Sequence, residues 1–259
     1  WVSDNIWKKD KWWDWREKVC SYYIDECEKI TFSGPRDYKS KYIYGSITIY
    51  ILNKVHSKIS YKKSTLLDTL KDVDLRMKPV KWAADWSCFK ERRWCASDDE
   101  TVLNIFKINS LAEYFHIVIH EVAGHIVDLW VLKWEARRYD TTYKEFWQKT
   151  FKIDDPSIWF YALSRMGEKV RKKETDMKSF CSMYGMTNMF EDFAECALMF
   201  KNHNLYFKTL AQSNDILRKK YMYFYNLYDW NYLFANPKQS AEAKKNMTKR
   251  VWDLTKLDW

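Results

Sequence analysis

Two short segments constrain this chain more than any other feature: HEVAGH at residues 120–125 and YGMTNMFEDFAE at residues 184–195. The first contains two histidines and a glutamate, which are His120, Glu121 and His125. The second contains a tyrosine and two glutamates that are four residues apart. Two imidazoles and a carboxylate can hold a divalent metal ion, and a further carboxylate beside such an ion can activate water. A fold that uses both segments has to bring them together around one site.

The segment SLAEYFHIVIHEVAGHIVDLW, residues 110–130, is predicted to form one helix. Ser110 is a suitable N-cap, and Glu113 follows three residues later, which is the pattern of a capping box. The helix would carry three of the five histidines of the chain. Its apolar residues are mostly three or four apart, as a buried helix requires: Leu111, Phe115, Val118, Ile119, Val122, Ile126 and Leu129.

The histidine spacing differs from the HExxH motif, in which the two ligands stand at i and i+4. His120 and His125 are five apart, which places them about 140° from each other around a regular helix. A π-bulge, whose hydrogen bonds run from i to i+5, brings the second histidine back to the same face, and Gly124 is where a distorted backbone is easiest to hold. His116 and His120, at i and i+4, are an alternative pair. A second alternative is that no metal binds and that His116 is simply a buried or half-buried helix histidine.

A second helix is predicted at residues 188–202, after the cap-type residues Thr187 and Asn188. Glu191 and Glu195 are four apart and share one face of it. Carboxylates beside extensive apolar surface need a partner, so we assign Glu191 as the third metal ligand and Glu195 as the group that orients a ligand imidazole. The alternative is a solvated pair on the helix surface. The apolar neighbours are Phe190, Phe193, Ala194, Ala197 and Leu198.

Together with Tyr184, these glutamates resemble in type and spacing the Tyr, zinc-binding Glu and following Glu of the anthrax lethal factor type of zinc metallopeptidase. The longer HExxGH form of the helix motif is itself known in a dipeptidyl peptidase family. The resemblance extends from the helix at 111 to the helix that ends near 201. It implies a zincin-like α+β fold in which a small mixed sheet packs on the zinc-binding helix and the C-terminal half is mainly helical.

The same resemblance implies a role for each site residue. His120, His125 and Glu191 would bind Zn²⁺, Glu121 would act as general base, and Tyr184 would stabilise the transition state. A zinc-bound water has a pKa of about 7, which makes it a nucleophile at neutral pH. We therefore expect a zinc-dependent metalloendopeptidase that acts on a protein or peptide substrate. The alternative is a catalytically inactive, peptidase-like module that binds protein or cell-wall polymer.

Composition narrows the other functional classes. Hydrophobic residues make up 47% of the chain, as in globular proteins, and no apolar run reaches the roughly 18 residues that suggest a transmembrane segment. The formal net charge is +9, but the basic clusters at 169–173 and 244–250 are typical of solvated helix faces. No nucleic-acid-binding motif accompanies them, so we expect no nucleic-acid partner. The oligomeric state is left open.

The chain has six cysteines, and none of them has the CxxC spacing of a zinc ribbon. Local disulfides fit this even number and imply an oxidising setting, so we expect a secreted protein, extracellular or in the cell envelope. The alternative is a set of reduced structural thiols. The spacing groups the cysteines into three pairs: Cys20 with Cys27, Cys88 with Cys95, and Cys181 with Cys196.

Tryptophan is unusually frequent and glycine unusually rare, with 15 of the first and 5 of the second, against a usual glycine share of about 7%. Trp130 follows the predicted zinc helix, where a glycine often ends a helix. We hypothesise that many of these tryptophan positions are encoded by UGA codons, which the source organism reads as glycine. The rival hypothesis is a genuine Trp-rich surface that binds sugars or wall polymers. Asp-Trp also replaces the common turn dipeptide Asp-Gly at four places: Asp14–Trp15, Asp85–Trp86, Asp229–Trp230 and Asp258–Trp259.

The rest of the chain gives weaker signals. Residues 76–100 are expected to be rich in loops. Strands are predicted at 41–52 and 101–108, and further helices at 62–73, 141–152, 213–228 and, more weakly, 239–256. The predicted organisation is an N-terminal extension at 1–40, a catalytic domain at 41–235 and a basic C-terminal tail at 236–259.

Overall fold

The structure is a computed structural model that describes residues 77–79, 94–96, 101–103, 111–132, 142–145, 149–152, 155–235 and 250–256. The chain divides into two compact units: Trp1–Ile47 with Leu70–Asn109, and Thr48–Thr69 with Ser110–Trp259. In the first unit three short strands form a sheet of order β1-β3-β2, with β1 parallel and β2 antiparallel to β3. These strands are β1 (Met77–Pro79), β2 (Trp94–Ala96) and β3 (Thr101–Leu103).

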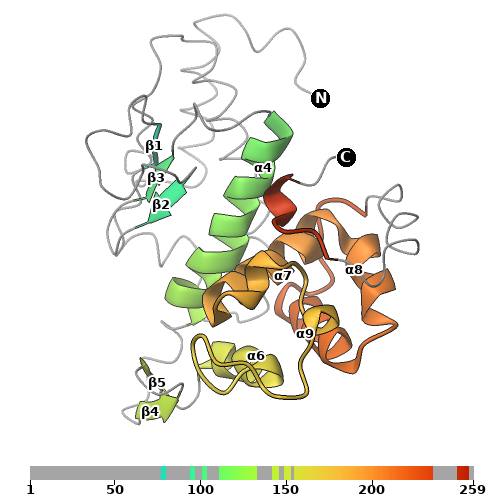
Figure 1. The fold of residues 1–259 in the computed structure, drawn as a ribbon. Helices are drawn as coiled ribbons and strands as arrows, with labels where there is room; N and C mark the ends of the chain where they lie inside the picture. The colour runs from blue at the N-terminus through green and yellow to red at the C-terminus, as the bar shows by residue number, and fades with distance from the viewer. Residues whose placement is uncertain are drawn as a thin grey trace, which may run out of the picture. The chain divides into compact units, whose positions relative to one another are not determined.

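The second unit is built mainly from helices (Figure 1). Its long elements are α4 (Leu111–Ile119), η5 (His120–Leu132), α6 (Pro156–Ser164), α7 (Met189–Asn202), α8 (Asn204–Ala211) and α9 (Asp215–Leu227). Three short 3₁₀ segments complete it: η6 (Met177–Ser179), η7 (Tyr184–Met186) and η8 (Leu254–Lys256). None of the helices in the described ranges is long and apolar enough to span a membrane.

Helix α7 is the centre of this unit and packs against η5, α6, α8 and α9. Nearly all of it is buried, from Met189 to Asn202. Its Phe193 ring lies 5.1 Å from that of Phe160 on α6 and 4.9 Å from that of Phe224 on α9, in edge-to-face contacts. Such ring pairs stabilise a core beyond the area they bury. The aromatic cluster fixes α7 between α6 and α9, and with it the residues on the opposite face of α7.

The predicted helices at 188–202 and 213–228 are confirmed by α7 and α9. Both begin at an asparagine cap. The side chain of Asn188 accepts hydrogen bonds from the N–H groups of Phe190 and Glu191, both at 2.9 Å, and Asn214 accepts one from Leu217 N–H. Such caps satisfy the free N–H groups of the first turn. Glu191 therefore sits in a first turn whose backbone is firmly held.

The predicted α+β fold, in which a small mixed sheet packs on the metal-binding helix, is wrong. The described part of the chain is 67% helical, and its strands are only three or four residues long. Within the second unit, the partners of α4 and η5 are α6, α7 and η8. The physical reason lies in residues 156–227, whose aromatic side chains bury against one another between helices.

The predicted helix at 141–152 is also wrong, because β4 (Thr142–Glu145) and β5 (Lys149–Lys152) pair as an antiparallel hairpin. Threonines and aromatic residues recur in this stretch, and they favour strand over helix. Helix α8 was not predicted. Its His203 is both the C-cap of α7 and the N-cap of α8, so no glycine or proline marks the boundary.

Other predictions fall partly or wholly outside the described residues. This applies to the strand at 41–52, the helix at 62–73 and residues 239–249 of the weak helix. Strand β3 covers the first three residues of the predicted strand 101–108. The predicted domain boundaries at residues 40 and 235 also stay predictions.

Candidate metal centre

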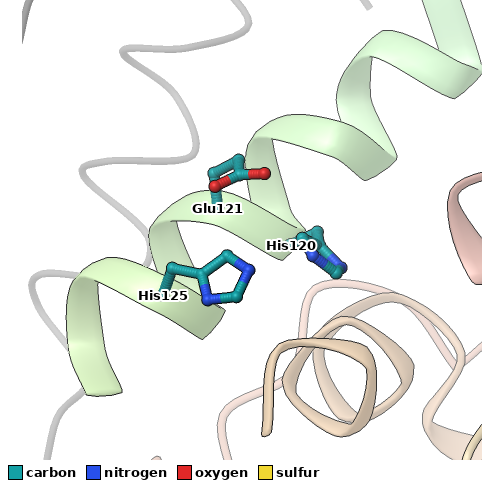
Figure 2. Close-up of side chains that lie close together, drawn as sticks. All are labelled: His120, Glu121 and His125. Atoms are coloured by element: carbon teal, nitrogen blue, oxygen red, sulfur yellow. The ribbon is translucent and has the colours of Figure 1, made fainter. Parts of the chain in front are cut away.

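The two predicted metal-binding histidines lie where the helix changes its geometry. Helix α4 ends at Ile119, and η5 continues it from His120 to Leu132 as a π-helix. The predicted π distortion is confirmed, although it extends over 13 residues rather than a single turn. The ring centroids of His120 and His125 are 5.0 Å apart, and Figure 2 shows the His125 ring directed toward His120. Hydrogen bonds from i to i+5 thus bring together two residues that a regular α-helix would separate.

Two features hold this part of η5 in place. The first is a close crossing with α7 at Gly124, where an added Cβ would lie 2.5 Å from both the Cα and the Cβ of Ala194, closer than such atoms approach. The Tyr228 hydroxyl at the end of α9 donates a hydrogen bond to the Ala123 carbonyl. Gly124 therefore serves a close helix crossing, which brings the glutamates of α7 up to the histidines of η5.

Glu191 meets both imidazoles with one oxygen atom. Its Oε2 lies 3.2 Å from His120 Nε2 and 3.3 Å from His125 Nε2. In a tetrahedral zinc site with bonds of roughly 2.0–2.1 Å, neighbouring ligand atoms lie about 3.3 Å apart. Both Glu191 distances match that spacing. Among the described residues, the group whose ligand atoms all lie within 4.8 Å of one another is His120, Glu121 and His125, which could hold a metal ion.

Glu195 lies behind His120 and is fully buried. Its Oε1 is 2.9 Å from His120 Nδ1, and its Oε2 accepts a hydrogen bond of 3.0 Å from the Leu254 N–H. When His120 donates its Nδ1 proton to this carboxylate, the lone pair of Nε2 is free to face the site. This is how carboxylates orient metal-binding histidines.

Tyr184 stands on the other side of Glu191. Its hydroxyl donates a hydrogen bond of 3.1 Å to Glu191 Oε1, and its ring stacks on His120 with centroids 6.3 Å apart. The turn η7 that carries Tyr184 is fixed by Arg165, which donates a hydrogen bond of 2.7 Å to the Gly185 carbonyl. The structure therefore brings all six predicted site residues together, and the role of each stays a prediction.

A disulfide joins Cys181 to Cys196, as predicted. It ties the segment before Tyr184 to α7, two residues beyond the crossing with η5 at Ala194. The Cys20–Cys27 and Cys88–Cys95 pairs lie outside the described residues.

The charges of the site favour a cation. Burial raises the pKa of the Glu121 carboxyl, and His125 and His120 only partly oppose this. Burial would likewise raise the pKa of Glu191, but the hydrogen bonds from the two histidines outweigh it and hold that pKa far below its usual value. Burial lowers the pKa of His120, yet Glu191 and Glu195 raise it well above the ordinary value. The carboxylates therefore favour positive charge between them, either as protons on the two imidazoles, whose pKa values they raise, or as a divalent ion in place of those protons.

His116, the alternative ligand, is directed elsewhere. It is fully buried, its Nδ1 lies 3.1 Å from the Thr255 carbonyl oxygen, and its ring packs against His203 with centroids 5.0 Å apart. These contacts fit a buried helix histidine and separate His116 from the group around Glu191.

Sequence reasoning missed three groups that support the site: the Leu254 N–H, the Tyr228 hydroxyl and the Arg165 guanidinium. Leu254 acts through its backbone, which no residue pattern reveals. The other two come from segments without a motif of their own.

No known protein family, curated protein or solved structure matches the chain.

Proposed function

We propose that this protein is a zinc metallopeptidase that hydrolyses peptide bonds with a metal-activated water. The observation that carries the proposal is the position of Glu191 Oε2, 3.2 and 3.3 Å from the Nε2 atoms of His120 and His125. Two imidazole nitrogens and one carboxylate oxygen form a donor set that suits zinc, and three protein ligands leave a fourth position for water. His120, His125 and Glu191 would hold the ion, and Glu195 would orient His120.

A zinc ion in this position supplies a lowered pKa for bound water and polarises a carbonyl oxygen. Glu121, the residue next to His120, is the general base in this proposal. Its carboxylate accepts a proton from the attacking water and passes it to the leaving amine. Burial raises the pKa of Glu121, which brings its basicity closer to the value needed for proton transfer at neutral pH.

Tyr184 is the second catalytic residue of the proposal. Its hydroxyl donates to Glu191 Oε1 at 3.1 Å, so a small rotation would turn the proton toward an oxyanion that forms beside the ion. Burial and the neighbouring Glu191 raise the pKa of Tyr184, which keeps the phenol protonated as a hydrogen-bond donor. Donors aimed at developing charge commonly contribute more to acyl-transfer catalysis than any other single effect.

The substrate class in this proposal is protein or peptide, and the setting is extracellular or the cell envelope. The Cys181–Cys196 disulfide supports an oxidising compartment. The alternative function is an inactive, peptidase-like binding module, for which the unusual histidine spacing is the argument. The presence of Glu121 and Tyr184 beside the histidines favours turnover, because a binding module needs neither group.

The test combines metal content with cleavage of an unfolded protein. We expect one zinc per chain in the wild type by elemental analysis, and its loss in Glu191→Ala. Glu121→Gln should keep the zinc and lose about 10²–10⁴-fold in kcat, the usual contribution of a general base. Glu174→Gln, at an exposed position, is the matched control and should change neither.

The remaining outcomes test the function, the ligand set and the metal in turn. Zinc that binds without cleavage, in the wild type as in Glu121→Gln, would favour the binding module. Zinc that stays in Glu191→Ala would exclude Glu191 as a ligand and favour the group of His120, Glu121 and His125. A wild type without zinc would overturn the proposal.

A further inference from the structure

We infer that residues 250–256, here called the C-terminal strap, are a working part of the metal centre, and that the Leu254 N–H positions His120 through Glu195. The inference rests on the proposed zinc site. It changes the interpretation of this end of the chain, for which the sequence predicts only a basic tail and a weak helix. The strap lies in the same compact unit as the site.

The strap is bound along one side to the segment that precedes and includes Tyr184. The N–H groups of Met183 and Tyr184 donate to the carbonyls of Val251 and Trp252, at 2.9 and 2.7 Å. The Arg250 guanidinium, almost fully buried, donates from Nε to the Phe180 carbonyl at 2.8 Å and from a terminal nitrogen to the Lys178 carbonyl at 3.0 Å. These bonds fix the backbone from which the Tyr184 phenol projects.

Next along the chain, the strap reaches the carboxylate behind His120. Leu254 N–H donates to Glu195 Oε2 at 3.0 Å, while Glu195 Oε1 holds His120 Nδ1 at 2.9 Å. Both oxygens of this fully buried carboxylate are therefore occupied, and the carboxylate cannot rotate freely. A chain of two hydrogen bonds joins the strap to the imidazole, and the strap sets the orientation of the ring.

The end of the strap is anchored on α4. The Thr255 carbonyl oxygen lies 3.1 Å from His116 Nδ1, and the Leu254 side chain is fully buried. Figure 1 shows η8, in red, beside α4 and α7. Asp253 closes the turn by accepting a hydrogen bond of 2.9 Å from Thr255 N–H. One short segment thus contacts both α7, which carries Glu195, and α4, which leads directly into His120.

Leu254 is a positioning residue, and its backbone N–H is the active group. Groups that orient a metal ligand typically contribute 10–100-fold to metal affinity. The Leu254 side chain contributes to packing instead. The two contributions can be separated, because Leu254 is the first residue of η8, a position where proline fits the helix backbone and removes only an N–H group.

The experiment compares Leu254→Pro with Leu254→Ala in the full chain. Leu254→Ala removes buried side-chain atoms but keeps the N–H, whereas Leu254→Pro removes the N–H. We expect Leu254→Pro to lower zinc affinity about 10–100-fold in competition with a chelating dye and to change the absorption spectrum of bound Co²⁺. Leu254→Ala should keep the wild-type affinity and spectrum. Equal effects of the two variants would overturn the inference.

Two further measurements keep the test sharp. If Leu254→Pro does not fold, an ester in place of the peptide bond before residue 254 deletes the same N–H without a ring. Nitrogen NMR of labelled histidine in the metal-free protein should show a changed His120 signal for the proline or ester variant and none for Leu254→Ala. Changed His120 signals in a protein that never binds zinc would sink the proposed function but not the positioning role. Zinc binding by a protein whose His120 signal is unchanged in the proline or ester variant would overturn the positioning role but leave the proposed function standing.

Discussion

Gly124 on η5 lies so close to Ala194 on α7 that a Cβ at position 124 would be 2.5 Å from both the Cα and the Cβ of Ala194. Gly124 directly precedes His125 in the chain, and Ala194 directly precedes Glu195. The crossing of the two helices is therefore also the point where the histidines meet the glutamates. The distance between η5 and α7 sets the geometry of the candidate metal centre.

Gly124→Ala should push the two helices apart. The clash is with the Cα and Cβ of Ala194, neither of which can rotate away, so we expect a loss of about 3 kcal/mol in the free energy of unfolding, the upper end for an overpacked core. Zinc affinity should fall with it. Gly185→Ala is the matched control, because its Cβ would meet Asp192 Cα at 3.4 Å, an ordinary contact. Urea unfolding of both variants measures the difference, and equal stability would contradict the tight crossing.

The disulfide between Cys181 and Cys196 closes a loop with a sequence separation of 15 residues. Closing a loop of that length stabilises a fold by about 3 kcal/mol through the entropy of the unfolded chain. We expect Cys181→Ala with Cys196→Ala to lose that amount in urea unfolding. Turnover and zinc content should both fall, because the bridge lies beside the Tyr184 turn and because Cys196 directly follows Glu195, the carboxylate that holds His120.

Reductant provides the control for this prediction. Wild type should approach the stability of the double variant when reduced. The double variant itself should respond to reductant only through the four cysteines at positions 20, 27, 88 and 95. A wild type that reductant leaves fully stable would show that the bridge does not constrain the unfolded chain.

The site was easier to predict from the sequence than the fold. Histidine spacing, a cap and two glutamates four apart are local signals, and they placed α7, the π distortion and five of the six grouped residues, whereas Tyr184 was added by the family resemblance. The failures concern long-range packing. The threonines and aromatics of 141–152 favour strands by composition, but strand pairing depends on the partner that the segment finds, and the predicted helix does not form because β4 pairs with β5. The Leu254 N–H reaches Glu195 across 59 positions, a contact that no local pattern encodes.

Asp128 gives the unit a dependence on pH. It is buried, and burial raises the pKa of its carboxyl to about 7, although Ser157 and the Tyr161 hydroxyl, 2.6 Å from each oxygen, favour the charged form. A folded-state pKa above the unfolded value means that the native state binds the proton more tightly. The stabilisation is therefore complete below about pH 4 and is lost as the pH rises through about 7.

Asp128→Asn should abolish this slope. We expect the free energy of unfolding of the wild type to fall, relative to the variant, between pH 4 and pH 7 in urea titrations. Asp215→Asn is the control: Asp215 is exposed and its neighbours Lys219 and Arg218 lower its pKa, so its contribution is lost only at more acidic pH. A parallel pH dependence of wild type and Asp128→Asn would show that Asp128 is charged throughout.

Trp230 follows the end of α9 with a left-handed backbone, φ 66°, after Asp229 at φ 46°. Its N–H donates to the Tyr225 carbonyl five residues earlier at 3.0 Å, as in the helix ends that glycine favours. Its ring is 65% exposed and stacks on Tyr225. This backbone supports the hypothesis of a reassigned codon at 230.

At Trp130 the expected helix end is wrong, because η5 continues to Leu132.

Trp230→Gly should raise the free energy of unfolding by about 1 kcal/mol, because left-handed backbone costs other residues about 1–2 kcal/mol and the lost stacking offsets part of the gain. Trp159→Gly, at an exposed position inside α6, should instead lower it by about 1 kcal/mol. Trp230→Ala keeps the strained backbone and should bring no gain. If both glycine variants lose stability alike, position 230 has no preference for glycine. Peptide masses of the protein from its own host then decide the codon: the mass of glycine at 230 establishes the reassignment, and that of tryptophan excludes it there.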